Sequence, residues 1–205
     1  MKVLFIQRHL SPNRGGVERV TNILANYFCE REIECFHACT VKDNPTEIDD
    51  NHIVSYKTCN DPSSVVHVID YIIQKKIDIV INQDIVDESQ IFLIKILKKR
   101  LPQIKIIGVL HLNPEYESYK KYPLKTKIKQ LIIWLLFRYY KPQRQRAMIA
   151  RNVDKYVVLS PSYIKVVCRM FGISKKKVAA IPNPLSYRIP KYIPFKNKKK
   201  QFLIV

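Results

Sequence analysis

Two adjacent glycines, Gly15 and Gly16, separate a short apolar run at 2–7 from a segment with helical periodicity at 17–28. Glycine lets the backbone approach a ligand closely, and the free N–H groups of a helix N-terminus attract phosphate. The alternative interpretation is a glycine-rich turn that binds nothing. The two glycines are adjacent and no third follows in the helix, so the pattern matches neither GxGxxG nor a Walker loop and does not indicate NAD or ATP.

Two further polar residues follow apolar runs. His111 comes directly after the run at 104–110, and a neutral imidazole there could hydrogen-bond a sugar hydroxyl or polarise a transition state. The alternative is a structural histidine with satisfied hydrogen bonds. Asp84 follows the run at 77–82 and could accept hydrogen bonds from hydroxyls, or it could belong to a loop that caps the next helix.

Cys35, His37 and Cys39 alternate along one segment, which would place all three on one face of a strand. This resembles a metal patch, but the spacing differs from that of usual zinc pairs and free cysteine is common in cores. We therefore interpret the three as core residues and expect no metal site. Five unevenly spaced cysteines do not form a disulfide scaffold, and they fit a reduced, intracellular protein.

The segments that must position these residues alternate between strand and helix patterns. Predicted strands are 2–7, 33–41, 52–56, 77–82, 104–110, 155–159 and 177–181. Predicted helices are 17–28, 62–76, 88–100, 124–140 and 161–171, and Pro142 kinks or restarts the helical pattern. Most of the strands are near-continuous apolar runs, which indicates an α/β fold with a Rossmann-like parallel sheet and helices on both faces. Ligands of such sheets bind at the carboxyl ends of the strands.

A length of 205 residues predicts one domain and the beginning of a second. We expect a Rossmann-like domain at 1–185, a basic, proline-rich linker at 186–200, and the first strand of a truncated second domain at 201–205. The N-terminus has no signal-peptide core. The longest apolar run, 131–137, is seven residues, whereas a membrane-spanning helix needs about 20.

The net charge of +19 is unevenly distributed. Residues 1–117 carry 14 basic and 16 acidic side chains, whereas residues 118–205 carry 22 basic side chains and one acidic side chain. Such asymmetry indicates an anionic partner. A membrane-surface element is the interpretation we favour for the lysines beside the apolar run, namely Lys120, Lys121, Lys125, Lys127 and Lys129. The alternatives are a solvated charged face or nucleic acid, for which no RNP, KH or helix-turn-helix pattern is present.

Taken together, several motifs resemble the N-terminal half of a retaining GT-B glycosyltransferase of family 4. They are GGVER at Gly15–Arg19 after KVLFIQ, GVLH at Gly108–His111, DKYVVLS at Asp154–Ser160, KVAAIPNP at Lys177–Pro184, and the terminal KKKQFLIV. Their order and spacing cover essentially the whole chain. The resemblance implies transfer of a sugar from a nucleotide-sugar donor to a glycan or lipid-linked acceptor, with retention at the anomeric carbon.

The resemblance also implies roles for individual residues. Gly15 and Gly16 would approach the donor diphosphate, and His111, as the catalytic residue, would lie beside the transferred sugar or the acceptor hydroxyl. Asp84, Asn113 and Glu18 would lie on the acceptor side. Ser160 and Asn183 would face the second domain. No DxD triplet occurs, which agrees with a metal-independent enzyme without a cofactor, since the nucleotide-sugar is a substrate.

The chain also departs from the family pattern. The second domain of family members carries a Glu-x7-Glu pair that grips the donor, and no two glutamates here are eight positions apart. The usual Asn-Gly after Ile-Pro is Asn183-Pro184. We therefore expect most of the donor site to come from a partner chain or a missing domain. We expect a cytoplasmic protein, peripheral on the inner membrane face, that acts in polysaccharide or lipopolysaccharide biosynthesis.

Two other functions remain as alternatives. The first is a non-catalytic, truncated domain that binds polyanions, either a membrane surface or nucleic acid. The second is a Rossmann-type oxidoreductase. The missing third glycine and the lack of an acidic residue at the end of the second strand, Thr40-Val41-Lys42, argue against the oxidoreductase.

Overall fold

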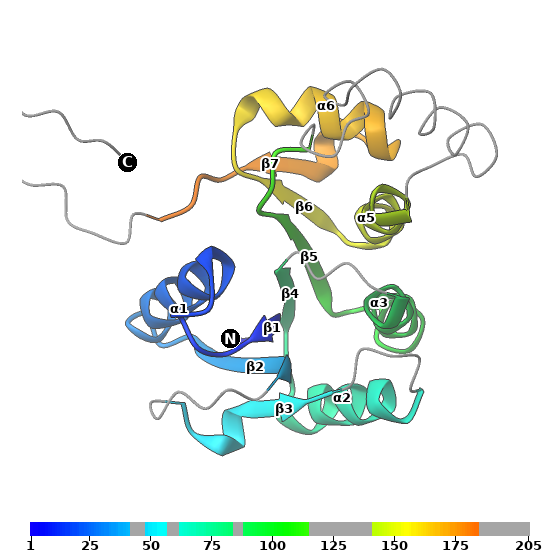
Figure 1. Ribbon diagram of the computed structural model, residues 1–205. Coiled ribbons are helices and arrows are strands. Elements are labelled where there is room, and N and C mark those ends of the chain that lie inside the picture. The colour runs from blue at the N-terminus through cyan, green and yellow to red at the C-terminus, as the bar shows by residue number, and fades with distance from the viewer. Residues whose placement is uncertain (42–47, 57–61, 84–87, 115–140, 185–205) are drawn as a thin grey trace, which may run out of the picture.

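The computed structural model describes residues 1–41, 48–56, 62–83, 88–114 and 141–184, and these form a parallel sheet flanked by helices (Figure 1). The strands are β1 (Lys2–His9), β2 (Glu34–Val41), β3 (Ile53–Ser55), β4 (Ile79–Gln83), β5 (Lys105–Leu110), β6 (Lys155–Val158) and β7 (Val178–Ala180). The helices are α1 (Gly16–Cys29), α2 (Pro62–Lys75), α3 (Glu88–Arg100), α5 (Lys141–Asn152) and α6 (Pro161–Phe171). Two short 3-10 helices, η1 (Asp50–His52) and η3 (Lys175–Lys177), precede β3 and β7.

All strand pairs are parallel, in the order β3-β2-β1-β4-β5-β6-β7. The chain builds outward from β1 to β3 and then returns to the other side of β1 with β4. The strand order therefore reverses between β1 and β4, and such a switch point is where ligands of doubly wound sheets bind. The predicted α/β, Rossmann-like fold is confirmed.

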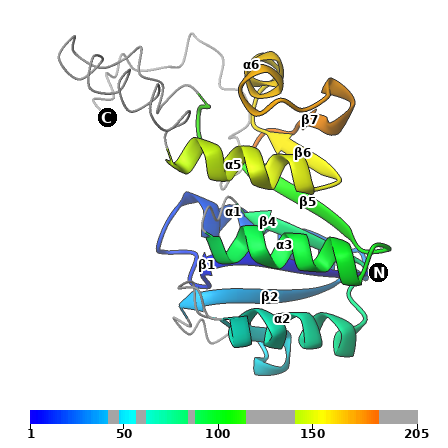
Figure 2. The same ribbon diagram turned by 90° about the vertical axis from the view of Figure 1, so that its right-hand side faces the viewer.

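The two faces of the sheet carry different helices. Among the described helices, α1 covers one face of the sheet, whereas α2, α3 and α5 lie on the other (Figures 1 and 2). Alternate residues of each strand point to opposite faces. Val3 and Phe5 of β1 therefore pack toward α1, and Leu4 and Ile6 join the larger core under α2, α3, α5 and α6.

Helix α6 shows how local signals in the sequence define an element. Ser160 is its N-cap, where the Oγ atom accepts a hydrogen bond from the backbone N–H of Ser162 at 3.3 Å. Pro161 occupies the first turn, where a proline removes no helical hydrogen bond. The helix ends at Gly172, whose left-handed backbone (φ 65°) favours glycine.

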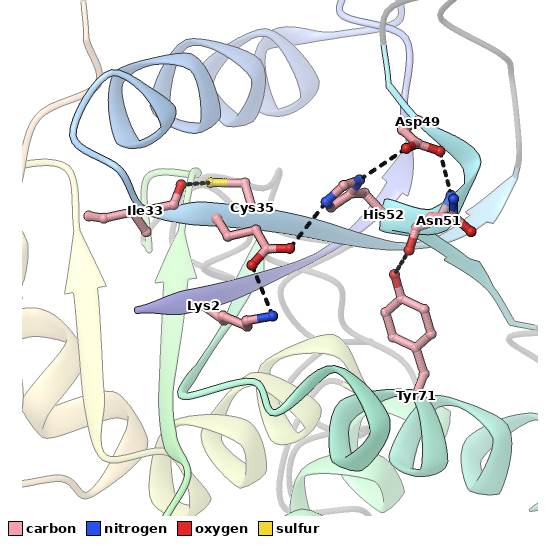
Figure 3. A network of polar contacts seen from close by, with 8 residues as sticks. Lys2, Ile33, Cys35, Asp49, Asn51, His52 and Tyr71 are labelled. Atoms are coloured by element: carbon pink, nitrogen blue, oxygen red, sulfur yellow. Dashed lines mark hydrogen bonds and ion pairs between the residues drawn. The ribbon is translucent and has the colours of Figure 1, made fainter.

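A polar network joins the start of β1 to the outer strands (Figure 3). Glu34 pairs with Lys2 Nζ at 2.9 Å and with His52 Nε2 at 3.3 Å, and the hydrogen bond from Lys2 holds the pKa of Glu34 below its usual value. Tyr71 of α2 donates to the backbone carbonyl of Asn51 at 2.8 Å. These contacts tie η1 and β3 to the sheet and to α2, at the edge opposite the carboxyl ends of the strands.

The predicted elements match the observed ones closely, with small shifts at their ends. β1 extends to His9, and β4 starts at Ile79 rather than residue 77. The reason for the second shift is that the N–H of Ile77 bonds to the carbonyl of Ile72 at 3.1 Å, so Ile77 closes α2. Pro142 lies in the first turn of α5.

The predicted helix 124–140, linker 186–200 and strand 201–205 lie outside the described residues. None of the described helices is both long and apolar enough to cross a bilayer.

Candidate functional site

The face of the sheet that carries α1 changes from apolar to polar toward the carboxyl ends of its strands. Phe5 pairs in register with Ile81 on β4 and with His37 on β2, and the next residues on this face are Gln7 and Gln83. His111 follows β5 directly. We call Gln7, His37, Gln83 and His111 the polar row, because their side chains lie on adjacent strands around the switch point.

The outer half of the polar row is fully buried. Gln7 Nε2 donates to His37 Nδ1 at 3.3 Å, and the ring of His37 stacks on Phe5 with centroids 5.7 Å apart. Burial lowers the pKa of His37 to about 4, so this imidazole is neutral at physiological pH.

The inner half of the polar row contains the predicted catalytic residue. His111 Nε2 lies 2.7 Å from Gln83 Oε1, and Gln83 is only 2 % exposed. Burial lowers the pKa of His111, and the nearby side chain of Asn183, just after β7, acts in the opposite direction. His111 is therefore a neutral hydrogen-bonding group at the carboxyl edge of the sheet, next to the switch point.

Three buried atoms of the polar row have no hydrogen-bond partner among the described residues. They are Gln7 Oε1, Gln83 Nε2 and His111 Nδ1. An unsatisfied buried polar atom is unfavourable by about 1–3 kcal/mol, so such atoms usually bind water or a ligand. Two acceptors and one amide donor of this kind match a hydroxyl-rich ligand, because each hydroxyl both donates and accepts.

The two glycines lie at the start of α1, next to the carboxyl end of β1. Gly15 is the N-cap residue in an extended conformation, and no side chain caps the helix. A Cβ atom at position 15 would lie 2.7 Å from the carboxylate of Glu18, whereas a Cβ atom at Gly16 would meet nothing within 4 Å. The space beside the Cα atom of Gly16 is therefore open, while Glu18 places its carboxylate beside the first turn, where the helix dipole favours negative charge.

The other residues that the sequence singled out have varied positions. The side chain of Asn183 lies near His111. Asn113 is exposed and lies two residues after His111, in the segment that follows β5. Ser160 caps α6. Asp84 and Lys120, Lys121, Lys125, Lys127 and Lys129 lie outside the described residues, so their roles remain predictions.

Sequence reasoning missed Gln7 and Gln83. Both are amides near the end of an apolar run, and that position was the available signal.

The alternating cysteines have separate environments, as a core interpretation requires. The Cys35 thiol lies against the backbone carbonyls of Ile33 and Ala25, at 3.6 and 3.7 Å, and burial raises its pKa to about 12. Cys39 Sγ lies 3.8 Å from the Ser55 hydroxyl. Within the described part of the chain, no three His, Cys, Asp or Glu side chains gather closely enough to hold a metal ion.

A basic cluster lies at the opposite edge of the sheet, where β5, β6 and β7 begin. Lys155 Nζ donates to the backbone carbonyl of Lys176 at 2.9 Å, and Lys177 Nζ donates to that of Arg151 at 2.7 Å. Burial, together with the charge of Lys98, lowers the pKa of Lys177. The amino-edge cluster comprises Lys98, Lys105, Arg151, Lys155, Lys176 and Lys177, and three of these, Lys98, Lys105 and Lys177, lie near the carboxylate of Asp154.

The fold is a Rossmann-like domain, and the polar row is its candidate ligand site at the carboxyl edge of the sheet. The model of the family described as Glycosyltransferase Family 4 matches residues 14–187. The chain therefore belongs to glycosyltransferase family 4, and the resemblance seen in the motifs is confirmed. No curated protein matches the sequence.

Solved structures support the same fold. A glycosyltransferase from Rickettsia africae ESF-5 matches with 17% identity and a TM-score of 0.52, over 88% of this chain and 42% of that one. An alpha-glucosyltransferase in complex with UDP and a 13-mer DNA containing an HMU base matches with 14% identity and a TM-score of 0.52, over 90% of this chain and 42% of that one. The chain thus spans about two-fifths of the length of these enzymes.

Proposed function

We propose that this domain supplies the acceptor-binding half of a retaining glycosyltransferase that uses a nucleotide-sugar donor and a glycan or lipid-linked acceptor. The observation that carries the proposal is the neutral His111, held by Gln83 at the switch point of a family 4 domain. Its hydrogen-bonding capacity suits a sugar hydroxyl, and its place at the end of β5 is the one that the family motif assigns to the transferred sugar or the acceptor.

The open space at Gly16 would allow the donor diphosphate to approach the start of α1. Asp84, Asn113 and Glu18 are the proposed acceptor-side residues. Transfer with retention would follow the front-face route of the family. The bond from the anomeric carbon to the diphosphate breaks, the bond to the acceptor oxygen forms on the same face, and the acceptor proton passes to the leaving diphosphate.

The test is sugar transfer from a panel of nucleotide-sugars, measured with the chain alone and with the chain produced together with the donor-binding domain of a family 4 glycosyltransferase. We expect transfer in the combined sample, and a loss of at least roughly 100-fold in kcat for His111→Gln. The matched control is His67→Gln, because His67 is an exposed histidine on α2. Full activity of the His111 variant, or no transfer from any donor, would contradict the proposal.

The amino-edge cluster favours a second candidate function, binding of a polyanion by the basic half of the chain. The basic residues of this cluster, of which Lys98, Lys105 and Lys177 lie near the Asp154 carboxylate, would create a positive field that attracts phosphate-rich partners. Binding of this kind weakens steeply as salt concentration rises. Duplex DNA, single strands and anionic vesicles, each titrated at several salt concentrations, test this function, and Lys155→Glu with Lys176→Glu should weaken the binding. Weak binding at low salt would exclude it.

A further inference from the structure

We propose that Gln83 is a positioning residue for His111: its side-chain carbonyl holds the ring proton on Nε2, so that Nδ1 is presented as a hydrogen-bond acceptor to a substrate hydroxyl. The assignment of the proton rests on the geometry of the two side chains. The role in sugar transfer rests in addition on the proposed function.

The contact between the two residues defines the direction of the hydrogen bond. Gln83 Oε1 lies 2.7 Å from His111 Nε2, and a carbonyl oxygen can only accept. With the Gln83 amide in this orientation, the ring proton is on Nε2. A neutral imidazole carries one ring proton, so the same contact leaves Nδ1 unprotonated.

The position of Gln83 in the sheet restricts the orientation of its side chain toward His111. It is the last residue of β4, which is hydrogen-bonded to β1 on one side and to β5 on the other, and it pairs in register with Val109, two residues before His111. With 2 % of its surface exposed, its side chain has little freedom to rotate. Groups supported by strands and by packing are positioned more accurately than groups on free loops.

Because His111 is neutral, its tautomer determines which ring nitrogen can accept a hydrogen bond. Burial lowers the pKa of this histidine, so the neutral ring dominates at neutral pH. In a cationic ring both nitrogens would donate, and Gln83 would determine nothing beyond orientation. In the neutral ring Gln83 determines which nitrogen accepts, and His111 Nδ1 is a buried atom without a partner among the described residues.

The tautomer can be measured directly in the full 205-residue chain, labelled with 15N on histidine. Nitrogen shifts and their long-range couplings to the ring protons distinguish Nε2–H from Nδ1–H, and a His111→Gln spectrum assigns the signal. We expect the Nε2–H tautomer for His111. Predominant Nδ1–H in the unmodified protein would overturn the proposal.

Two variants at Gln83 separate positioning from folding. Gln83→Met keeps the length of the side chain but removes the acceptor, so His111 should become a mixture of tautomers. Gln83→Glu keeps the acceptor and adds a negative charge, so His111 should remain Nε2–H and its pKa should rise. The matched control is Gln7→Met, which removes the amide beside His37 and should leave the His111 signal unchanged. An unchanged His111 signal in Gln83→Met would overturn the proposal.

The transfer assay supplies an independent readout. Gln83→Met should lower kcat by about 10- to 100-fold, as loss of a group that orients a functional imidazole does elsewhere, with a smaller effect on KM. Gln83→Glu should restore part of this loss and shift the pH profile toward higher pH. A normal kcat in Gln83→Met would overturn the role in transfer. If His111→Gln is also fully active, the proposed function fails, while the NMR result still decides the tautomer.

Discussion

The imidazole of His37 stacks on the phenyl ring of Phe5 across two neighbouring strands, with ring centroids 5.7 Å apart. This pair marks the boundary between the apolar core beneath α1 and the polar row at the carboxyl edge. His37 is 4 % exposed, and its only polar side-chain contact that we describe is with Gln7. A proton on this ring would be buried without a counter-charge, which has a consequence for stability.

We expect His37 to make the domain less stable in weak acid. Its pKa is about 4 in the folded protein and near 6.5 in the unfolded chain, so the unfolded chain binds the proton first. The free energy of unfolding should therefore fall from pH 6.5 downward, by about 3 kcal/mol at pH 4 relative to pH 7.5. Urea unfolding of the protein and of His37→Asn at both pH values measures this contribution. Equal pH dependence in the two proteins would contradict the prediction.

Gly108 leaves room for Tyr156 on the adjacent strand. A Cβ atom at position 108 would lie 2.9 Å from Cδ2 of Tyr156, a buried side chain that packs edge-on against Phe171. Gly108→Ala should therefore reduce the free energy of unfolding by about 1–3 kcal/mol. Gly16→Ala is the matched control, because its added methyl group would meet nothing and its stability should change by about 0.5 kcal/mol or less. Denaturant unfolding at pH 7 compares the two.

Asp154 links three elements at the amino edge of the sheet. Its Oδ2 accepts from Lys98 Nζ at 2.5 Å and from the backbone N–H of Ile106 at 2.7 Å. We expect Asp154→Ala to lower the free energy of unfolding by about 1–3 kcal/mol, and Asp154→Asn to cost less because its carbonyl can still accept from Ile106. Equal losses in both variants would assign the effect to the charge of Asp154 rather than to its hydrogen bonds.

The same carboxylate has a defined pH dependence. Partial burial alone would raise the pKa of Asp154, but the hydrogen bonds from Lys98 and Ile106 outweigh it and lower the pKa below 3.8. Because the folded pKa is the lower one, the stabilisation is complete above about pH 4 and disappears as the pH falls through the lowered value. The difference in unfolding free energy between the protein and Asp154→Asn should shrink on acidification below that pH.

The lysine-rich segment predicts binding to anionic membranes. Lys120, Lys121, Lys125, Lys127 and Lys129 should each contribute about 1 kcal/mol near an anionic surface, so replacing all five by Glu should abolish sedimentation with anionic vesicles. An equal change of net charge elsewhere should have a smaller effect. For that control we choose exposed residues far along the chain from this segment, namely Lys76, Lys95, Lys99, Lys165 and Arg169. Unchanged vesicle binding of the first variant would exclude the membrane interpretation.

Much of the fold could be predicted from local patterns. The run KVLFIQ, the helical spacing of 17–28 and the capped start of α6 depend on interactions between residues close in sequence, so each leaves a readable pattern. His111 and the glycine pair stood out for the same reason, because each follows an apolar run. The prediction for β4, 77–82, starts two residues too early and ends one residue too early. The start is wrong because the hydrogen bond of Ile77 to α2 is not visible in hydropathy.

By itself, the sequence determined the alternation of strands and helices, the parallel character of the sheet and the position of the candidate site residues at strand ends. Only the tertiary structure decided that Gln83 lies against His111, that Asn183 lies near the same histidine, and that basic residues from α3, β5 and η3 lie near Asp154. Periodicity records which face of an element is buried. The order of the strands depends on contacts between strands. These contacts join residues dozens of positions apart, which share no local pattern in the sequence.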